Sequence, residues 1–117
     1  MSIAAYIFAV VLIAAGIYHF VNPSFYYPII PRWLPAKAAN LAGGAAEIVL
    51  GGMMLLPATR TYGLYGTAAL MVAFLPVHVV DLLRERPVIG PKYVAWLRLV
   101  AQFLLIGWLL WEARRSA

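Results

Sequence analysis

The sequence predicts an all-α integral membrane protein: a four-helix bundle with a proline-broken interfacial segment between helices 1 and 2. Hydrophobic residues make up 65% of the 117 residues and charged residues only 11%, whereas soluble domains are about half apolar and about a quarter charged. Four apolar stretches of about 19–22 residues are each long enough to cross a ~30 Å hydrocarbon core as a helix. Because no hydrophilic stretch is long enough to fold separately, we expect one transmembrane domain over residues 1–117.

Each apolar stretch is expected to be helical because a backbone inside lipid must satisfy its own hydrogen bonds. The expected spans cover residues 3–21, 38–56, 62–83 and 93–111. Pro57 begins a tight turn after the second span. Pro87 and Pro91 prevent the third span from continuing into the fourth. Pro76 lies inside the third span and is expected to kink it.

The connection between the first two spans, residues 22–35, is rich in prolines and aromatic residues. The prolines exclude a long helix. Phe25, Tyr26, Tyr27 and Trp33 are typical of the headgroup level of a membrane. Two interpretations stay open: an interfacial anchor, which the general occurrence of aromatic belts favours, and a lid over a pocket between the helices.

Polar side chains interrupt the apolar spans in one half of the expected bundle. Four spans place both termini on one side, the terminal side, and the first and third connections on the other, the loop side. The polar residues in the loop-side half are His19, Glu47, His78, Asp81, Arg98 and Gln102. Glu47 is the deepest, about nine residues or ~14 Å from the loop side. The terminal-side half is expected to be dry and apolar.

Helical spacing places these polar groups on shared faces. Gly43, Glu47 and Gly51 form one stripe, whose small residues would let a neighbouring helix approach closely. His78 and Asp81 share a face of the third span, as Arg98 and Gln102 share a face of the fourth. The cost of a charged group at the bilayer centre is about 2.5–3.5 kcal/mol, so these groups must meet each other, a ligand or water.

We therefore expect a polar pocket in the loop-side half, in which Glu47 and Arg98 have complementary charges and share one network, directly or through a single water or ligand. A purely structural alternative stays open. In that case Glu47 and Arg98 pair only to hold helices together, His19 lies among the headgroups and Asp81 points towards Arg84.

Composition and spacing narrow the chemistry of such a pocket. The absence of cysteine excludes a disulfide, a thiol relay or an iron–sulfur cluster on this chain. The net charge of +5 lies mainly in the connections, which is typical of contact with anionic headgroups and not of nucleic-acid binding. Haem ligation by the two histidines has no further support, and no HxxxH or ExxH spacing favours a metal site. A polar headgroup with an apolar tail remains, and a quinone has that form; no cofactor, metal ligand or catalytic residue is assigned with certainty.

Several segments resemble DoxX-like membrane proteins, and together they cover nearly the whole chain. The matching segments are residues 15–20 (AGIYHF), 22–23 (NP), 30–35 (IPRWLP), 43–52 (GGAAEIVLGG), 56–60 (LPATR), 76–78 (PVH) and 96–98 (WLR), with Gln102. The resemblance implies a small four-helix protein of the bacterial inner membrane. It also implies a redox context, since the namesake is associated with a thiosulfate:quinone oxidoreductase and relatives with redox complexes, maturation of secreted enzymes or membrane chaperone roles. Its specific polar placements are His19, Glu47, His78 and Arg98.

Two functions stay open. The first is a subunit of a membrane redox system that binds quinone or another lipid-soluble ligand in the pocket formed by the six polar residues. The second is a non-catalytic assembly or chaperone subunit whose polar cluster is structural. A transporter ranks last because no inverted repeat is evident. The expected partners are the lipid bilayer, a lipid-soluble ligand and a redox-partner protein, without nucleic acid; a homo-oligomer is compatible with the sequence.

Overall fold

The computed structural model describes residues 1–88 and 90–117, and within them the chain is helical without strands. The elements are α1 (Ile3–Val21), the short 3-10 helices η1 (Pro23–Phe25) and η2 (Tyr27–Ile29), α2 (Ala36–Leu55), α3 (Arg60–Ala73), α4 (Leu75–Leu83) and α5 (Lys92–Ser116). Four helical segments are long and apolar enough to cross a membrane, and α3 and α4 together form the third of them. The all-helical prediction and its four long apolar helices are confirmed.

The third helical segment is broken at Phe74, between α3 and α4. Pro76 lies in the first turn of α4, where its missing N–H costs nothing because the first N–H groups of a helix have no intrahelical acceptor. The break lies where Pro76 predicted a kink. Because of this break, His78 and Asp81 lie in a separate helix, α4, and not in a continuation of α3.

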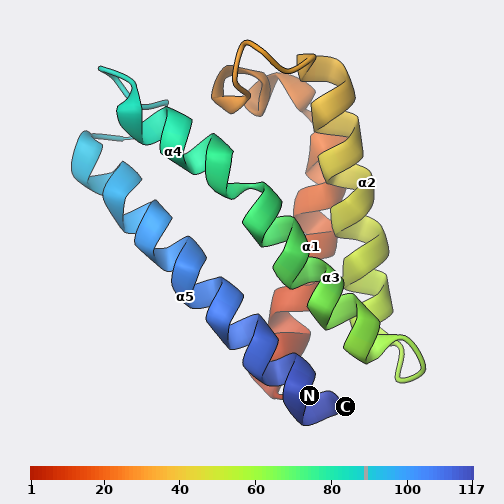
Figure 1. Ribbon diagram of the computed structural model, residues 1–117. Helices are drawn as coiled ribbons and strands as arrows, with labels where there is room; N and C mark the ends of the chain where they lie inside the picture. The colour runs from red at the N-terminus through yellow and green to blue at the C-terminus, as the bar shows by residue number, and fades with distance from the viewer. Residues whose placement is uncertain (89) are drawn as a thin grey trace.

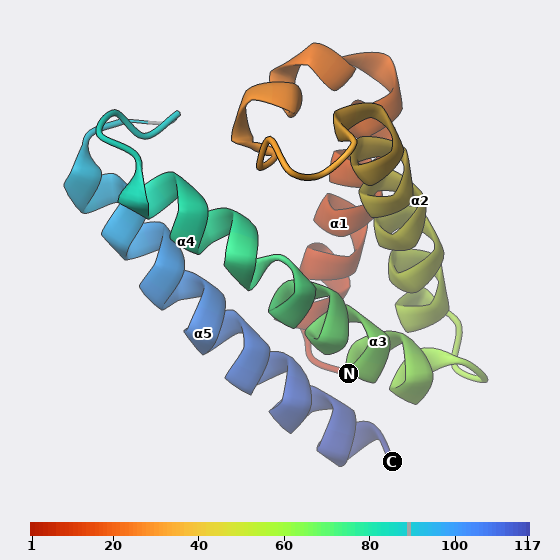
Figure 2. The ribbon, with the colours of Figure 1, turned by 45° about the horizontal axis from the view of Figure 1, so that its top comes forward.

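The helices diverge towards the loop side. Figures 1 and 2 show α1 beside α2, and α5 running along α3 and α4. Both views place α4 and the start of α5 away from the loop-side ends of α1 and α2, with η1 and η2 near those ends. The two termini lie together at the opposite end of the molecule (Figure 1), as an even number of spans requires.

Glycines allow α1 and α2 to cross at close range. A Cβ atom on Gly16 would lie 2.7 Å from the carbonyl oxygen of Gly44, and one on Gly44 would lie 2.6 Å from the Cβ atom of His19. Such contacts are too short for any larger residue without movement of a helix. By contrast, a Cβ atom on Gly43 would meet only Phe74 and His19 ring atoms, at 3.7 Å and 3.8 Å. Within the predicted stripe, Gly51 is such a helix contact, since a Cβ atom on it would lie 2.6 Å from the Ile13 side chain, whereas Gly43 has a more open face.

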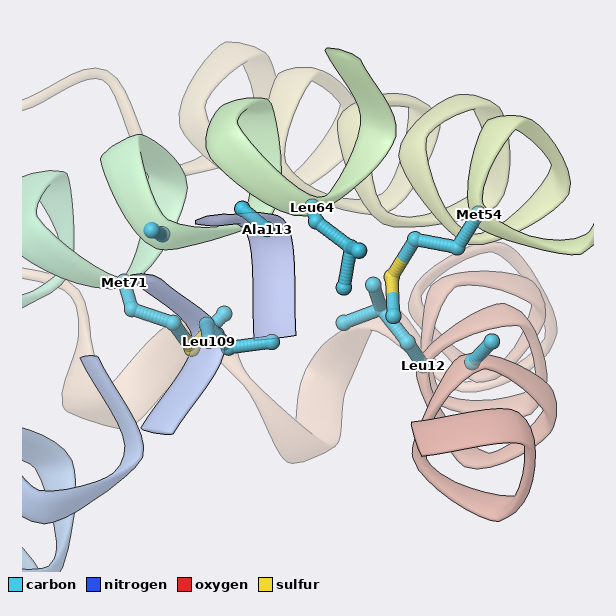
Figure 3. Packing of buried hydrophobic residues seen from close by; sticks show 8 residues of the cluster. Leu12, Met54, Leu64, Met71, Leu109 and Ala113 are labelled. Carbon is cyan, nitrogen blue, oxygen red and sulfur yellow. The ribbon is translucent and has the colours of Figure 1, made fainter. Parts of the chain in front are cut away.

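The apolar core lies in the terminal-side half of the bundle, and Figure 3 shows how its side chains pack against one another. Its buried residues are Ala9, Leu12, Met54, Leu64, Ala68, Met71, Leu109 and Ala113. They come from the first half of α1, the end of α2, α3 and the last part of α5. Packing of these side chains holds together the end of the molecule that lies opposite the polar groups.

The expectation of a terminal-side half without buried polar groups is wrong at Glu112, which is 1% exposed. Its carboxylate accepts hydrogen bonds from the hydroxyl and the backbone N–H of Ser2. Ser2 is also the N-cap of α1, so the carboxylate lies near the positive end of that helix dipole. Sequence analysis ended the fourth span at residue 111; α5 instead continues to Ser116 and carries Glu112 to the start of α1.

Candidate functional site

A buried series of hydrogen bonds joins His19, at the end of α1, to two side chains of α2. His19 Nδ1 lies 2.6 Å from Asn40 Oδ1, and His19 Nε2 lies 3.2 Å from Glu47 Oε1. The Asn40 amide also donates to the carbonyl oxygen of His19 at 2.9 Å. Asn40 and Glu47 are two helical turns apart and therefore share one face of α2. The three side chains are buried, and the Oε2 atom of Glu47 has no hydrogen bond within the described residues.

The connection between α1 and α2, residues 22–35, is called the aromatic segment below. It covers these hydrogen-bonded side chains from the loop side. The Tyr26 ring stacks on the His19 imidazole with 3.6 Å between centroids and 10° between planes. The Tyr26 hydroxyl donates to the carbonyl oxygen of Ala15 at 3.3 Å. Burial, and next the nearby Glu47 carboxylate, raises the pKa of the Tyr26 phenol, so the phenol remains a neutral hydrogen-bond donor. The His19 ring is thus fixed at both nitrogens and on one face.

A cavity of about 560 Å³ lies beside Glu47, between α1, α2, α3, α4 and the aromatic segment. Its polar wall residues are His19, Tyr26, Asn40, Glu47 and His78, and its other wall residues are Ile29, Ile30, Leu34, Ala39, Ala42, Gly43, Ala46, Leu70, Ala73, Phe74 and Val77. Helix α5, which is described in full, contributes none of them. The cavity is therefore mostly apolar, with polar groups from three different helices and the aromatic segment.

The aromatic segment combines the two interpretations left open by the sequence. Tyr26, Ile29 and Leu34 line the cavity, as expected of a lid. The side chains of Phe25 and Trp33 are mainly exposed instead, at 53% and 69%, as expected of an interfacial anchor. One face of the segment therefore lines the cavity, and the other points away from the protein.

Asp81 is fully buried and organises a second polar network outside the cavity. Arg98 Nη1 donates to its Oδ2 atom at 2.8 Å, and the Val88 backbone N–H donates to its Oδ1 atom at 2.9 Å. Arg84 Nη1 lies 3.3 Å from the same Oδ1 atom and donates to the carbonyl oxygen of Pro28 at 2.7 Å. These contacts tie α4, α5, the connection between them and the aromatic segment together.

Glu47 and Arg98 make no direct contact, so the direct form of the predicted shared network is wrong, whereas a link through a single water or ligand stays a prediction. Arg98 is bound to Asp81, and Glu47 is bound to His19. The reason is the helix arrangement: at this level α5 packs against α4, whereas Glu47 faces α1 across the glycine crossing. Complementary charge alone did not identify the partner, because Asp81 offers Arg98 a nearer carboxylate.

Of the six predicted site residues, three line the cavity, two belong to the second network and one belongs to neither. His19, Glu47 and His78 line the cavity, and the buried Nδ1 atom of His78 makes no hydrogen bond with the described part of the chain. Asp81 and Arg98 form the second network, and Gln102 donates to the carbonyl oxygen of Met71 at 2.9 Å. Within residues 1–88 and 90–117, no three His, Cys, Asp or Glu side chains converge on a point where a metal could bind.

Sequence analysis missed Asn40 as a site residue and did not single out Tyr26. Asn40 had a usable signal, since it lies on the Glu47 face of α2 and a buried amide in an apolar helix needs a partner. Tyr26 had none, because it is one of several aromatic residues in the same short segment. Its stack on His19 and its hydrogen bond to Ala15, both visible only in the structure, distinguish it from the others.

The fold and the cavity define a class: small helical proteins with four membrane-length apolar segments and an internal, mostly apolar pocket. Within that class, the chain belongs to the family described as a domain of unknown function, DUF8561, which matches residues 8–113. The matched region contains the whole cavity and both polar networks. No curated protein and no solved structure matches the chain.

Proposed function

We propose that the protein is an integral membrane subunit that binds a lipid-soluble ligand in the loop-side cavity. The observation that carries this proposal is Glu47, which is 6% exposed, lines the cavity and keeps one carboxyl oxygen without a hydrogen bond in the described chain. A buried polar group without a partner is costly. A ligand in the adjacent cavity would supply the missing hydrogen bond.

The form of the cavity supports the same proposal. Pockets for small molecules have volumes of about 300–1,000 Å³, apolar walls and a few convergent polar groups. The cavity here has about 560 Å³ and aromatic walls from Phe74 and the stacked His19–Tyr26 pair, which suit a ring. Ala42 and Ala73 are exposed wall residues on α2 and α3, so an apolar tail would leave the cavity between these helices.

The resemblance to DoxX-like proteins extends the proposal to a cellular context. On that basis we place the protein in a redox system of the bacterial inner membrane, with a quinone-type ring as the candidate ligand and a redox protein as the candidate partner. His19, Glu47 and His78 would contact the head of the ligand. Arg98 would act indirectly, through its ion pair with Asp81 at the end of α4.

A second candidate function is a non-catalytic assembly or chaperone subunit. The Asp81 network favours it, because the contacts of Asp81, Arg98 and Arg84 tie the loop-side ends together. Gln102 likewise serves helix packing. In this case the cavity would have no ligand of its own, and the surface would dock a partner protein.

Solvent extraction of the purified protein distinguishes the two functions. We expect mass spectrometry of the extract to show one lipid-soluble compound in near-stoichiometric amount. Gly43→Leu should reduce that amount about tenfold, because the new side chain would project towards Phe74 and the His19 ring and fill the cavity.

Gly52→Leu is the matched control for this experiment. A Cβ atom on Gly52 meets nothing within 4 Å, so the same added bulk on the same helix lies outside the cavity. Gly52→Leu should retain the compound at the level of the unmodified protein. Extracts that contain the same bulk lipids for all three proteins would favour the assembly subunit.

A further inference from the structure

Hydrogen-bond partners fix the position of the protons in the chain from Asn40 to Glu47. The Asn40 amide nitrogen donates to the carbonyl oxygen of His19, so the amide oxygen is the atom that faces His19 Nδ1. An amide oxygen only accepts, and therefore His19 Nδ1 carries a hydrogen. This assignment leaves His19 Nε2 as the nitrogen that faces Glu47.

The contact between His19 Nε2 and Glu47 Oε1, at 3.2 Å, holds one proton. Without a proton, two lone pairs would face each other in a buried place. With one proton on the nitrogen the pair is an imidazolium and a carboxylate, and with one on Oε1 it is a neutral pair. In both cases Glu47 Oε2 has no hydrogen. The remaining oxygen of Glu47 is therefore a hydrogen-bond acceptor in either state.

Except for His78, each candidate donor for a carbonyl ligand already makes a hydrogen bond to another part of the protein. Arg98 donates to Asp81, and Gln102 donates to the carbonyl oxygen of Met71. Within the cavity, the Asn40 amide and the Tyr26 hydroxyl donate to backbone carbonyl oxygens. His78 Nδ1 is the adaptable group, because an imidazole nitrogen donates or accepts according to its tautomer.

We propose that the cavity selects a lipophilic ring that carries a hydroxyl group, such as a hydroquinone or another phenol, over the corresponding quinone. The hydroxyl would donate to Glu47 Oε2. A quinone offers only carbonyl oxygens, which would face the acceptor oxygen of Glu47 and leave it unpaired. This inference rests on the proposed function, since it names the chemical class of ligand for the same cavity.

The direct test compares three ligands of nearly equal shape. They are a decyl-substituted benzoquinone, its hydroquinone and the dimethyl ether of that hydroquinone, titrated calorimetrically without oxygen into delipidated protein. We expect the hydroquinone to bind about 10- to 100-fold more tightly than the other two ligands. This is the difference in affinity expected when one charge-assisted hydrogen bond is missing. The Gly43→Leu variant, whose cavity is filled, serves as the control: any heat it gives reports partition of the ligand into detergent and not binding in the cavity.

The outcomes separate this inference from the proposed function. If the quinone or the ether binds as tightly as the hydroquinone, the donor requirement is refuted while the ligand site stands. If none of the three binds more tightly to the unmodified protein than to Gly43→Leu, both proposals fail. The comparison needs no substitution at Glu47, so it does not depend on whether such a variant folds.

Two variants at Glu47 test its role through the ratio of the affinities for the hydroquinone and its ether. A merely structural Glu47 would not affect this ratio. In Glu47→Gln, the amide nitrogen would donate to the unprotonated His19 Nε2 and the amide oxygen would take the place of Oε2, so the preference for the hydroquinone should persist. In Glu47→Leu the acceptor is lost, and the ratio between the hydroquinone and its ether should fall to about one. Equal weakening of all three ligands in both variants would contradict the inference.

Discussion

At the residue scale, each buried charge in the loop-side half has a local partner, and the partners divide into two separate groups. Glu47 is held by His19, and Arg98 is held by Asp81. Within the described residues no hydrogen bond or ion pair links one group to the other. The residues of the proposed ligand site are therefore different from those that tie α4 to α5.

This separation predicts that substitutions in the two groups act independently. Arg98→Leu leaves the Asp81 carboxylate buried without its closest cation, and should lower the free energy of unfolding by about 3 kcal/mol. Glu47→Gln should cost less, because Gln keeps a donor for His19 and an acceptor. The double variant should lose the sum of the two effects within about 0.5 kcal/mol in detergent unfolding experiments. A cost well below the sum would show that the two groups are coupled.

At the scale of elements, the glycine crossing between α1 and α2 positions His19 against Glu47. The crossing is close because Gly16 and Gly44 have no side chain to separate the helices. Leucine or even alanine at either position would push α1 away from α2. The cavity wall and the helix contact therefore depend on adjacent glycines, Gly43 and Gly44, that face different neighbours.

The close crossing of α1 and α2 predicts that alanine substitutions at two glycines of α2 have different effects on stability. Gly44→Ala would place a methyl group 2.6 Å from the Cβ atom of His19, and should lower the free energy of unfolding by about 1–3 kcal/mol through overpacking. Gly52→Ala meets no atom within 4 Å and should leave stability unchanged or slightly raised, because alanine favours the helix. Thermal unfolding in detergent measures both. Equal stability of the two variants would contradict the close crossing.

At the scale of the whole molecule, the sequence predicted how far along each helix the polar residues lie. It was less informative about which side chains of different helices are adjacent. Span length and proline positions predicted the four long helices and the break near Phe74, because these features depend on local chemistry. Connectivity placed His19, Glu47 and His78 in one half, and all three line the cavity. The pairing of Arg98 with Asp81 depends on which helices are adjacent, and that is set by tertiary packing.

The proposed function requires that the cavity hold a lipid-soluble ring against Glu47. A crystal structure of the protein grown in a lipid phase with the decyl hydroquinone tests this most directly. We expect the ring between Phe74 and the His19–Tyr26 stack, with its hydroxyl oxygen about 2.5–2.7 Å from Glu47 Oε2, as for a hydrogen bond to a carboxylate. A cavity closed by its own side chains, or a ligand bound only on the outer, lipid-facing surface, would contradict the claim.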